Sequence, residues 1–176
     1  RTLGVNLGAP GNRRDDEGRF WLAYPLLPHI KNPERESGLT AQISAKASPD
    51  GFYTHHATTT SGPLNWVAAS GCQGLETLEI DLNTRRKAVC RVDLVFADPD
   101  QPEPGRRVFD IRIEGQIAQR GFDIIRETGA TDRALVKSFD NIAVSDGALT
   151  IDLVSPESNA GNLPPLLCGV SISVQN

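Results

Sequence analysis

The stretch Val108–Gly115, with the sequence VFDIRIEG, decides the fold class of this chain. Apolar side chains at every second position, from Phe109 to Ile113, alternate with charged ones. In an extended strand successive side chains point to opposite faces, so this pattern places one face in a core and the other in solvent. Gly115 then lets the chain reverse direction. The stretch therefore predicts a half-buried β-strand that ends in a turn.

The same alternation recurs in other segments: 39–46, 77–82, 90–96, 149–153 and 170–174. Turn-forming residues separate them, and Asp146-Gly147 predicts a tight hairpin between 142–144 and 149–153. No window of helical length has helical periodicity, and only 131–136 is a candidate for a short helical turn. Many strands with one polar face each predict an all-β fold. We expect a jelly-roll-like β-sandwich of two antiparallel sheets.

Length and composition limit the domain count and the partners. A length of 176 residues is typical of a single domain, which we expect to span 1–176. The sequence contains 23% charged and 39% hydrophobic residues, a composition typical of globular proteins. A net charge of −4 argues against a nucleic-acid partner, which needs a basic face. No run of about 20 apolar residues predicts a membrane span. Because the chain begins at Arg1 and lacks methionine, we expect a module excised from a larger multidomain protein.

Cysteines and carboxylates give no sign of a catalytic centre or a cofactor. Cys72, Cys90 and Cys168 form no CxxC pair, and a Cys72–Cys90 disulfide stays an open alternative. Asp98 and Asp100 are candidate Ca²⁺ ligands, but their spacing matches no EF-hand loop, so we expect no cofactor and no metal. Nucleophile-elbow, phosphate-loop and zinc-protease motifs are all absent from the sequence. We expect a protein that is not an enzyme, although its parent protein could be one.

Several sequence blocks together resemble the malectin family of carbohydrate-binding domains. They are Gly4–Gly8, Phe96–Asp98, Val108–Gly115, Phe122–Ile124, Leu149–Ile151 and Leu167–Val170. The resemblance covers nearly the whole chain and implies a galactose-binding-domain-like jelly roll that recognises sugar through aromatic side chains on loops. It also implies an extracellular, periplasmic or otherwise exported location. Fold alone does not establish function, so the loops must be considered separately.

Both tryptophans and both tyrosines lie in or beside predicted loops, where a flat ring could stack on a sugar. Trp21 and Tyr53 match aromatic ligand contacts of the family, and Asn162 stands near an acidic one. After Phe96-Ala97 the family has two aromatic residues, whereas this chain has Asp98–Gln101. We predict a carbohydrate site formed by Trp21, Tyr24, Tyr53, His55 and Asn162. Each has a structural alternative, and Trp66 is expected in the core because apolar residues flank it.

Two functions follow from these observations. The first is a non-catalytic carbohydrate-binding module that binds an oligosaccharide or polysaccharide through loop aromatics and polar rim residues. The alternative is a protein-docking or spacer domain whose long loops, 8–33 and 61–74, contact neighbouring domains of the parent protein. A catalytic sugar-processing domain is the least favoured, because a glycosidase needs two carboxylates held across a cleft.

Overall fold

The computed structural model describes residues 2–25, 42–83, 87–100, 103–156 and 161–175. The predicted loop 8–33 and the predicted strand 39–46 therefore lie partly outside the described residues. The strands are β1 (Thr2–Leu7), β2 (Arg13–Arg14), β3 (Phe20–Tyr24), β4 (Ile43–Ala47), β5 (Phe52–Thr54), β6 (Ser70–Gln73), β7 (Leu75–Asp81), β8 (Ala88–Phe96), β9 (Val108–Ile113), β10 (Gln116–Asp123), β11 (Leu135–Val144), β12 (Ala148–Val154), β13 (Leu166–Leu167) and β14 (Gly169–Gln175). The helices are short: η1 (Ala57–Thr59), α2 (Asn65–Ala68) and α3 (Ile124–Thr128).

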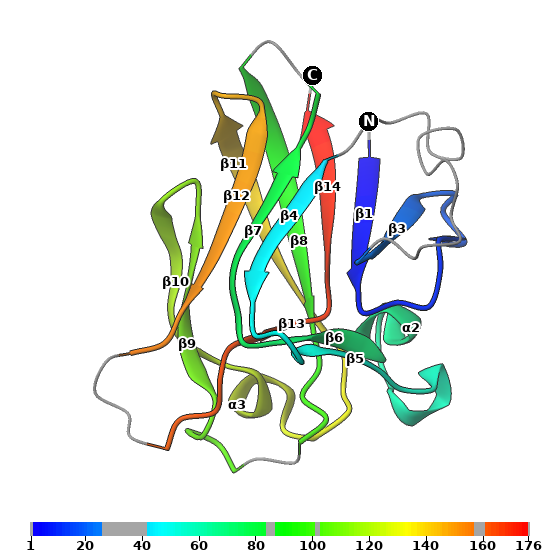
Figure 1. The fold of residues 1–176 in the computed structure, drawn as a ribbon, viewed down its shortest axis with the longest axis vertical. Helices are drawn as coiled ribbons and strands as arrows, with labels where there is room; N and C mark the ends of the chain where they lie inside the picture. Colours follow the sequence, from blue (N-terminus) through cyan, green and yellow to red (C-terminus); the bar gives the residue numbers. More distant parts are fainter. Residues whose placement is uncertain (1, 26–41, 84–86, 101–102, 157–160, 176) are drawn as a thin grey trace.

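The strands form two main sheets that confirm the predicted β-sandwich. One has the order β11-β8-β14-β1-β3-β2 and the other β10-β9-β12-β7-β4. Neighbouring strands are antiparallel with one exception, because β1 and β3 run parallel, with Gly4 opposite Trp21. A small third sheet, β13-β6-β5, was not predicted; it lies across one end of the sandwich (Figure 1).

The core lies between the two main sheets and is built from the alternating apolar side chains. On β9 the residues Phe109, Ile111 and Ile113 are buried, while the charged residues between them are not. The same pattern holds on β7, β8 and β12. Phe96, Phe109 and Phe122 contact one another with ring centroids 4.7 to 6.3 Å apart. Because apolar burial is the main stabilising contribution to folding, these strands form the rigid frame for the loops.

Two predicted local features differ from the structure. Asp146-Gly147 does not close a hairpin, because β11 pairs with β8 in one sheet whereas β12 pairs with β7 and β9 in the other. The turn carries the chain from one sheet to the other. The predicted helical turn at 131–136 is also wrong: the helix lies earlier, in α3, where the side chain of Asp123 accepts a hydrogen bond from the Arg126 amide. A hairpin does form between β9 and β10, where Glu114 and Gly115 both have positive φ.

The first and last described strands are neighbours, with Thr2 opposite Ser173. Both chain ends therefore lie at one end of the sandwich, and the third sheet and α2 lie at the other (Figure 1). In the described part of the chain, no helix is both long and apolar enough to span a bilayer.

Candidate functional site

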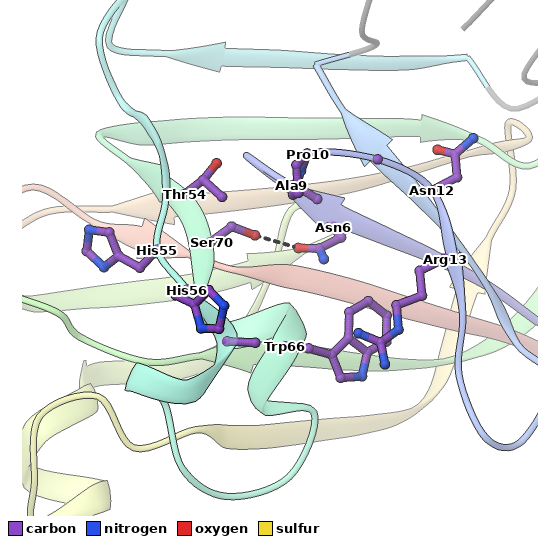
Figure 2. A pocket seen from close by; sticks show the side chains of 12 residues that line it. Asn6, Ala9, Pro10, Asn12, Arg13, Thr54, His55, His56, Trp66 and Ser70 are labelled. Carbon is purple, nitrogen blue, oxygen red and sulfur yellow. Dashed lines mark hydrogen bonds between the residues drawn. The ribbon is translucent and has the colours of Figure 1, made fainter.

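A pocket of about 660 Å³ lies at the end of the sandwich away from the two termini. Its walls come from the loop after β1, from the end of β5 with η1, and from α2 (Figure 2). The lining residues are Asn6, Ala9, Pro10, Gly11, Asn12, Arg13, Thr54, His55, His56, Ala57, Trp66 and Ser70. This volume falls within the range of about 300–1,000 Å³ that is typical of small-ligand sites.

Gly8 sets the course of the loop that forms one wall. Its φ of +69° lies in the left-handed region, and a Cβ there would stand 2.3 Å from the carbonyl oxygen of Tyr53. The Gly8 amide donates to the Tyr24 carbonyl at 2.7 Å, and the Thr54 hydroxyl donates to the Gly8 carbonyl. Only glycine combines this backbone with such a close approach. Gly8 thereby allows the loop after β1 to pack against β5.

The opposite wall is the indole of Trp66, which is partly exposed. Its ring meets the buried Trp21 edge-on, with centroids 5.6 Å apart and an interplanar angle of 79°. The guanidinium carbon of Arg13 lies 4.6 Å from the Trp66 ring centroid, within the range of a cation–π contact. Arg13 is placed there because β2 pairs with β3, with Arg13 opposite Trp21. In Figure 2 the Arg13 side chain reaches across the Trp66 ring.

Polar side chains form the back of the pocket. The Ser70 hydroxyl donates to Asn6 Oδ1 at 3.0 Å, and both residues are almost completely buried. The side-chain amide of Asn65 donates to the carbonyls of Ala57 and Thr60, and these hydrogen bonds connect η1 with α2. Hydrogen-bonding groups that are held in place by their own partners are preorganised for a polar ligand.

The ionisable residues that line this pocket are all basic: Arg13, His55 and His56. A neighbouring pocket of about 420 Å³ shares Arg13 and Trp66 but contains the acidic loop Asp15–Glu17. Arg13 and Trp66 therefore form the boundary between a basic and an acidic hollow.

Trp21 does not display its ring, so the prediction that it contacts a ligand from a loop is wrong. It lies on β3 and is 0% exposed. Its Nε1 donates to Asp15 Oδ2 at 3.0 Å. Although burial of the Asp15 carboxyl raises its pKa, hydrogen bonds from Trp21 and from the Arg19 amide hold the pKa below its usual value overall. Trp21 is thus a core residue with a satisfied N–H donor.

Tyr24 and Tyr53 do not line this pocket. Tyr24 is half-buried, with its ring edge-on to Phe52 at a centroid distance of 5.9 Å. The Tyr53 hydroxyl lies 3.7 Å from Sγ of the buried Cys168. Burial, followed by the nearby Cys168 thiol, raises the pKa of Tyr53 far above its usual value. Of the predicted site residues, only His55 lines the pocket, and its contact with a ligand stays a prediction.

Asn162 is engaged in backbone pairing. Its amide accepts from the Val108 amide at 3.0 Å and donates to the Val108 carbonyl at 2.9 Å. The side chain thereby pairs with the first residue of β9 as a neighbouring strand would. The structure does not bring Asn162 together with His55 or Trp66.

The Asp98 region, where the family has two aromatic residues, holds a buried ion pair. Arg107 Nε donates to Asp98 Oδ2 at 2.7 Å, and the two side chains are 1% and 0% exposed. Arg107 also contacts Asp100 and the Pro164 carbonyl. The Arg107 guanidinium therefore binds the Asp98 and Asp100 carboxylate oxygens that a Ca²⁺ ion would need. Within the described ranges no group of three or more metal-ligating side chains could hold a metal ion.

The three cysteines are free and buried, so the Cys72–Cys90 disulfide is not formed. Burial raises the pKa of Cys72 and of Cys168 to about 12 in each case. Because only a thiolate is a good nucleophile, these thiols are structural.

Sequence reasoning missed Trp66, Arg13 and Asn6 as pocket residues. Trp66 was expected in the core, yet it is partly exposed and only packs against the core. The Ser61-Gly62-Pro63 run just before it signalled an irregular segment and was the one available clue. Nothing local in the sequence indicates that Arg13 meets Trp66, because that contact depends on the pairing of β2 with β3.

Comparison with protein families and solved structures gives a consistent fold. Residues 76–164, half of the chain, match the family model described as "Malectin domain". None of the curated protein sequences compared with the chain matches it. Among solved structures, β-glucuronidase of Bacteroides uniformis has a TM-score of 0.69 at 18% identity, covering 100% of this chain and 18% of that chain.

Two plant structures are also similar. The ANX2 ectodomain from Arabidopsis thaliana has a TM-score of 0.67 at 14% identity, covering 99% of this chain and 50% of that one. A chain of the complex of the plant peptide RALF23 with FER and LLG2 has a TM-score of 0.65 at 19% identity, covering 99% of this chain and 48% of that one. The chain thus spans at most half the length of these solved chains. Such low identities establish the sandwich fold alone.

Proposed function

Because this chain belongs to the malectin domain family, we propose that it is a non-catalytic carbohydrate-binding module of an exported, multidomain protein. Its ligand site is the pocket between the loop after β1, the end of β5 and α2. The observation that carries this proposal is the partly exposed indole of Trp66, set in a wall whose neighbours are hydrogen-bonding side chains. Sugars need both an aromatic surface for their C–H faces and polar groups for their hydroxyls.

The lining supports binding without catalysis. Glycoside hydrolysis needs two carboxyl groups on either side of the scissile bond, one as acid and one as base or nucleophile. The described lining of this pocket contains neither Asp nor Glu. Release of reducing ends from a bound polysaccharide would contradict the non-catalytic part of the proposal.

The test removes the aromatic side chain that lines the pocket. Trp66→Ala removes the aromatic wall while leaving the sheets intact, so we expect glycan affinity to fall by about 30-fold or more, the usual cost of losing a central aromatic contact. Binding is measured by affinity electrophoresis and calorimetry against neutral and acidic polysaccharides, with the protein tethered through its termini, away from the pocket. Val89→Ala is the control, because Val89 is 42% exposed on β8 and does not line the pocket.

Two results would contradict the proposal. One is a panel on which the folded wild-type domain binds no glycan. The other is equal binding by Trp66→Ala and wild type, with unchanged circular dichroism for both.

A protein-docking role is the second candidate, favoured by the likeness to a chain in the complex of a plant peptide with FER and LLG2. In that case the pocket would receive a peptide or a neighbouring domain. Sedimentation of the parent protein after cleavage between its domains distinguishes the roles. Co-sedimentation that Trp66→Ala abolishes, together with a blank glycan panel, supports docking over sugar binding.

A further inference from the structure

We propose that the pocket selects glycans that carry a carboxylate, that is, uronate residues, and that the guanidinium of Arg13 binds this carboxylate. The inference rests on the proposed function and names the substrate class of the same site.

The charge of the pocket is opposite to that of the chain. The whole chain has a net charge of −4, yet the ionisable lining residues are one arginine and two histidines. A cleft lined by one sign of charge concentrates ligands of the other sign. A neutral sugar gains nothing from this arrangement, whereas an anionic sugar does.

Among the described residues, no carboxylate pairs with Arg13. None of the ion pairs among the described residues includes it. The acidic groups of the adjacent hollow have other partners: Asp15 accepts from Trp21 and from the Arg19 amide, and Glu17 pairs with Arg19 at 3.0 Å. Asp16 is exposed there and lies outside the basic pocket. The guanidinium therefore keeps donors for a ligand.

Arg13 is also oriented in advance. Stacking on Trp66 at 4.6 Å restricts the guanidinium while its in-plane N–H groups remain able to donate. A carboxylate matches this planar fork with two parallel hydrogen bonds, which fixes direction as well as charge. Binding then loses less side-chain entropy than it would with an unrestricted arginine.

Groups for the sugar hydroxyls line the same pocket. Figure 2 shows His55 and His56 on the side of the pocket opposite Arg13 and Trp66, with Asn6 and Ser70 between the two sides. His56 Nδ1 accepts from the Thr58 amide at 3.3 Å, so a neutral His56 ring carries its proton on Nε2. The pocket thus combines one anion-binding fork with several neutral hydrogen-bonding groups, as a uronate requires.

The experiment uses polyglucuronate, polygalacturonate and polymannuronate oligosaccharides, each beside its carboxyl-reduced counterpart, in which every uronate has become the neutral hexose. Calorimetry at low and at moderate salt measures each affinity for wild type and for Arg13→Gln. The matched control is Arg14→Gln. Arg14 is the next residue of β2, but its guanidinium lies 5.1 Å from the Phe20 ring centroid and donates to the Gly18 carbonyl, outside the pocket.

We expect wild type to prefer at least one uronate over its reduced counterpart by about tenfold or more, as for a charge-assisted contact. Arg13→Gln removes this preference, because the affinity for the uronate falls to that for its carboxyl-reduced counterpart, and Arg14→Gln leaves the preference unchanged. Arg13→Lys, which keeps the charge but lacks the planar fork, recovers part of the preference.

Equal affinity for the acid and the reduced form overturns the inference while the proposed glycan binding stands. A preference for sulfated over uronate-bearing sugars overturns it as well, as does an Arg14→Gln defect equal to that of Arg13→Gln. A panel on which nothing binds overturns the proposed function itself.

Discussion

At the scale of single residues, Trp21 and Trp66 touch each other and yet differ in role. Trp21 lies over Gly4 of β1, so closely that a Cβ at Gly4 would stand 2.2 Å from the indole. Because Gly4 has no side chain, the Trp21 ring can pack against β1 at this position. Trp66 lies on α2, a helix of four residues, and is partly exposed. Identical side-chain chemistry therefore produces a core residue in one place and a candidate binding surface in the other.

Arg107 is the buried residue on which the Asp98 region depends. Removing it by Arg107→Ala leaves the Asp98 carboxylate buried without its cation, so we expect a loss of about 3–5 kcal/mol in the free energy of unfolding. Urea denaturation measures this loss. The neighbouring Arg106 is exposed, and Arg106→Ala is expected to change stability by less than about 0.5 kcal/mol. Equal effects of the two substitutions would show that the ion pair is not buried in solution.

At the scale of elements, the short segments that connect the strands fix where the strands begin and end. Asp123, the last residue of β10, is 3% exposed and joins two of these connections. Its Oδ1 accepts from the Arg126 amide at 3.1 Å, which caps α3, and its Oδ2 accepts from the Gly105 amide at 2.6 Å. One carboxylate thus fixes both the start of α3 and the loop that precedes β9.

Asp123→Ala should therefore destabilise the domain by about 1–3 kcal/mol, because it removes a helix cap and leaves a second amide without its acceptor. Thermal unfolding by circular dichroism measures the effect. Asp123→Asn keeps the acceptor oxygen and should lose less. If the alanine variant unfolds at the wild-type temperature, the carboxylate does not organise these loops.

At the scale of the whole molecule, the fold buries all three cysteines and places the pocket away from the chain ends. A buried thiol ionises at higher pH than an unfolded one, whose pKa is near 9.0. Folding therefore favours the protonated thiol. This contribution to stability is fully present below about pH 9 and is lost as pH rises toward about 12.

We accordingly expect an aromatic disulfide reagent at pH 8 to label the native domain only at the rate of its unfolding. In urea above the transition, all three thiols should react at once. Absorbance of the released thiolate measures both rates. Immediate labelling of one or more cysteines in the native domain would contradict the burial of these thiols.

The sequence predicted the sheets well and the pocket poorly, for a physical reason. Alternation on β7, β8, β9 and β12 reports burial on one face, and that signal is local to each strand. The pairing of strands is not local: Asp146-Gly147 reads as a hairpin turn, but the two strands it joins find partners in different sheets. Contacts such as Arg13 with Trp66 arise only after such pairing, so no spacing in the sequence reveals them.

By itself, then, the sequence determined an all-β sandwich, its buried faces and its likeness to the malectin family. Only the tertiary structure decided which rings face solvent. It placed Trp21 in the core, turned Tyr53 toward Cys168, and set Trp66 beside Arg13 in a basic pocket. The physical reason is that burial of a loop side chain depends on the segments that pack over it, and those segments are distant in the chain.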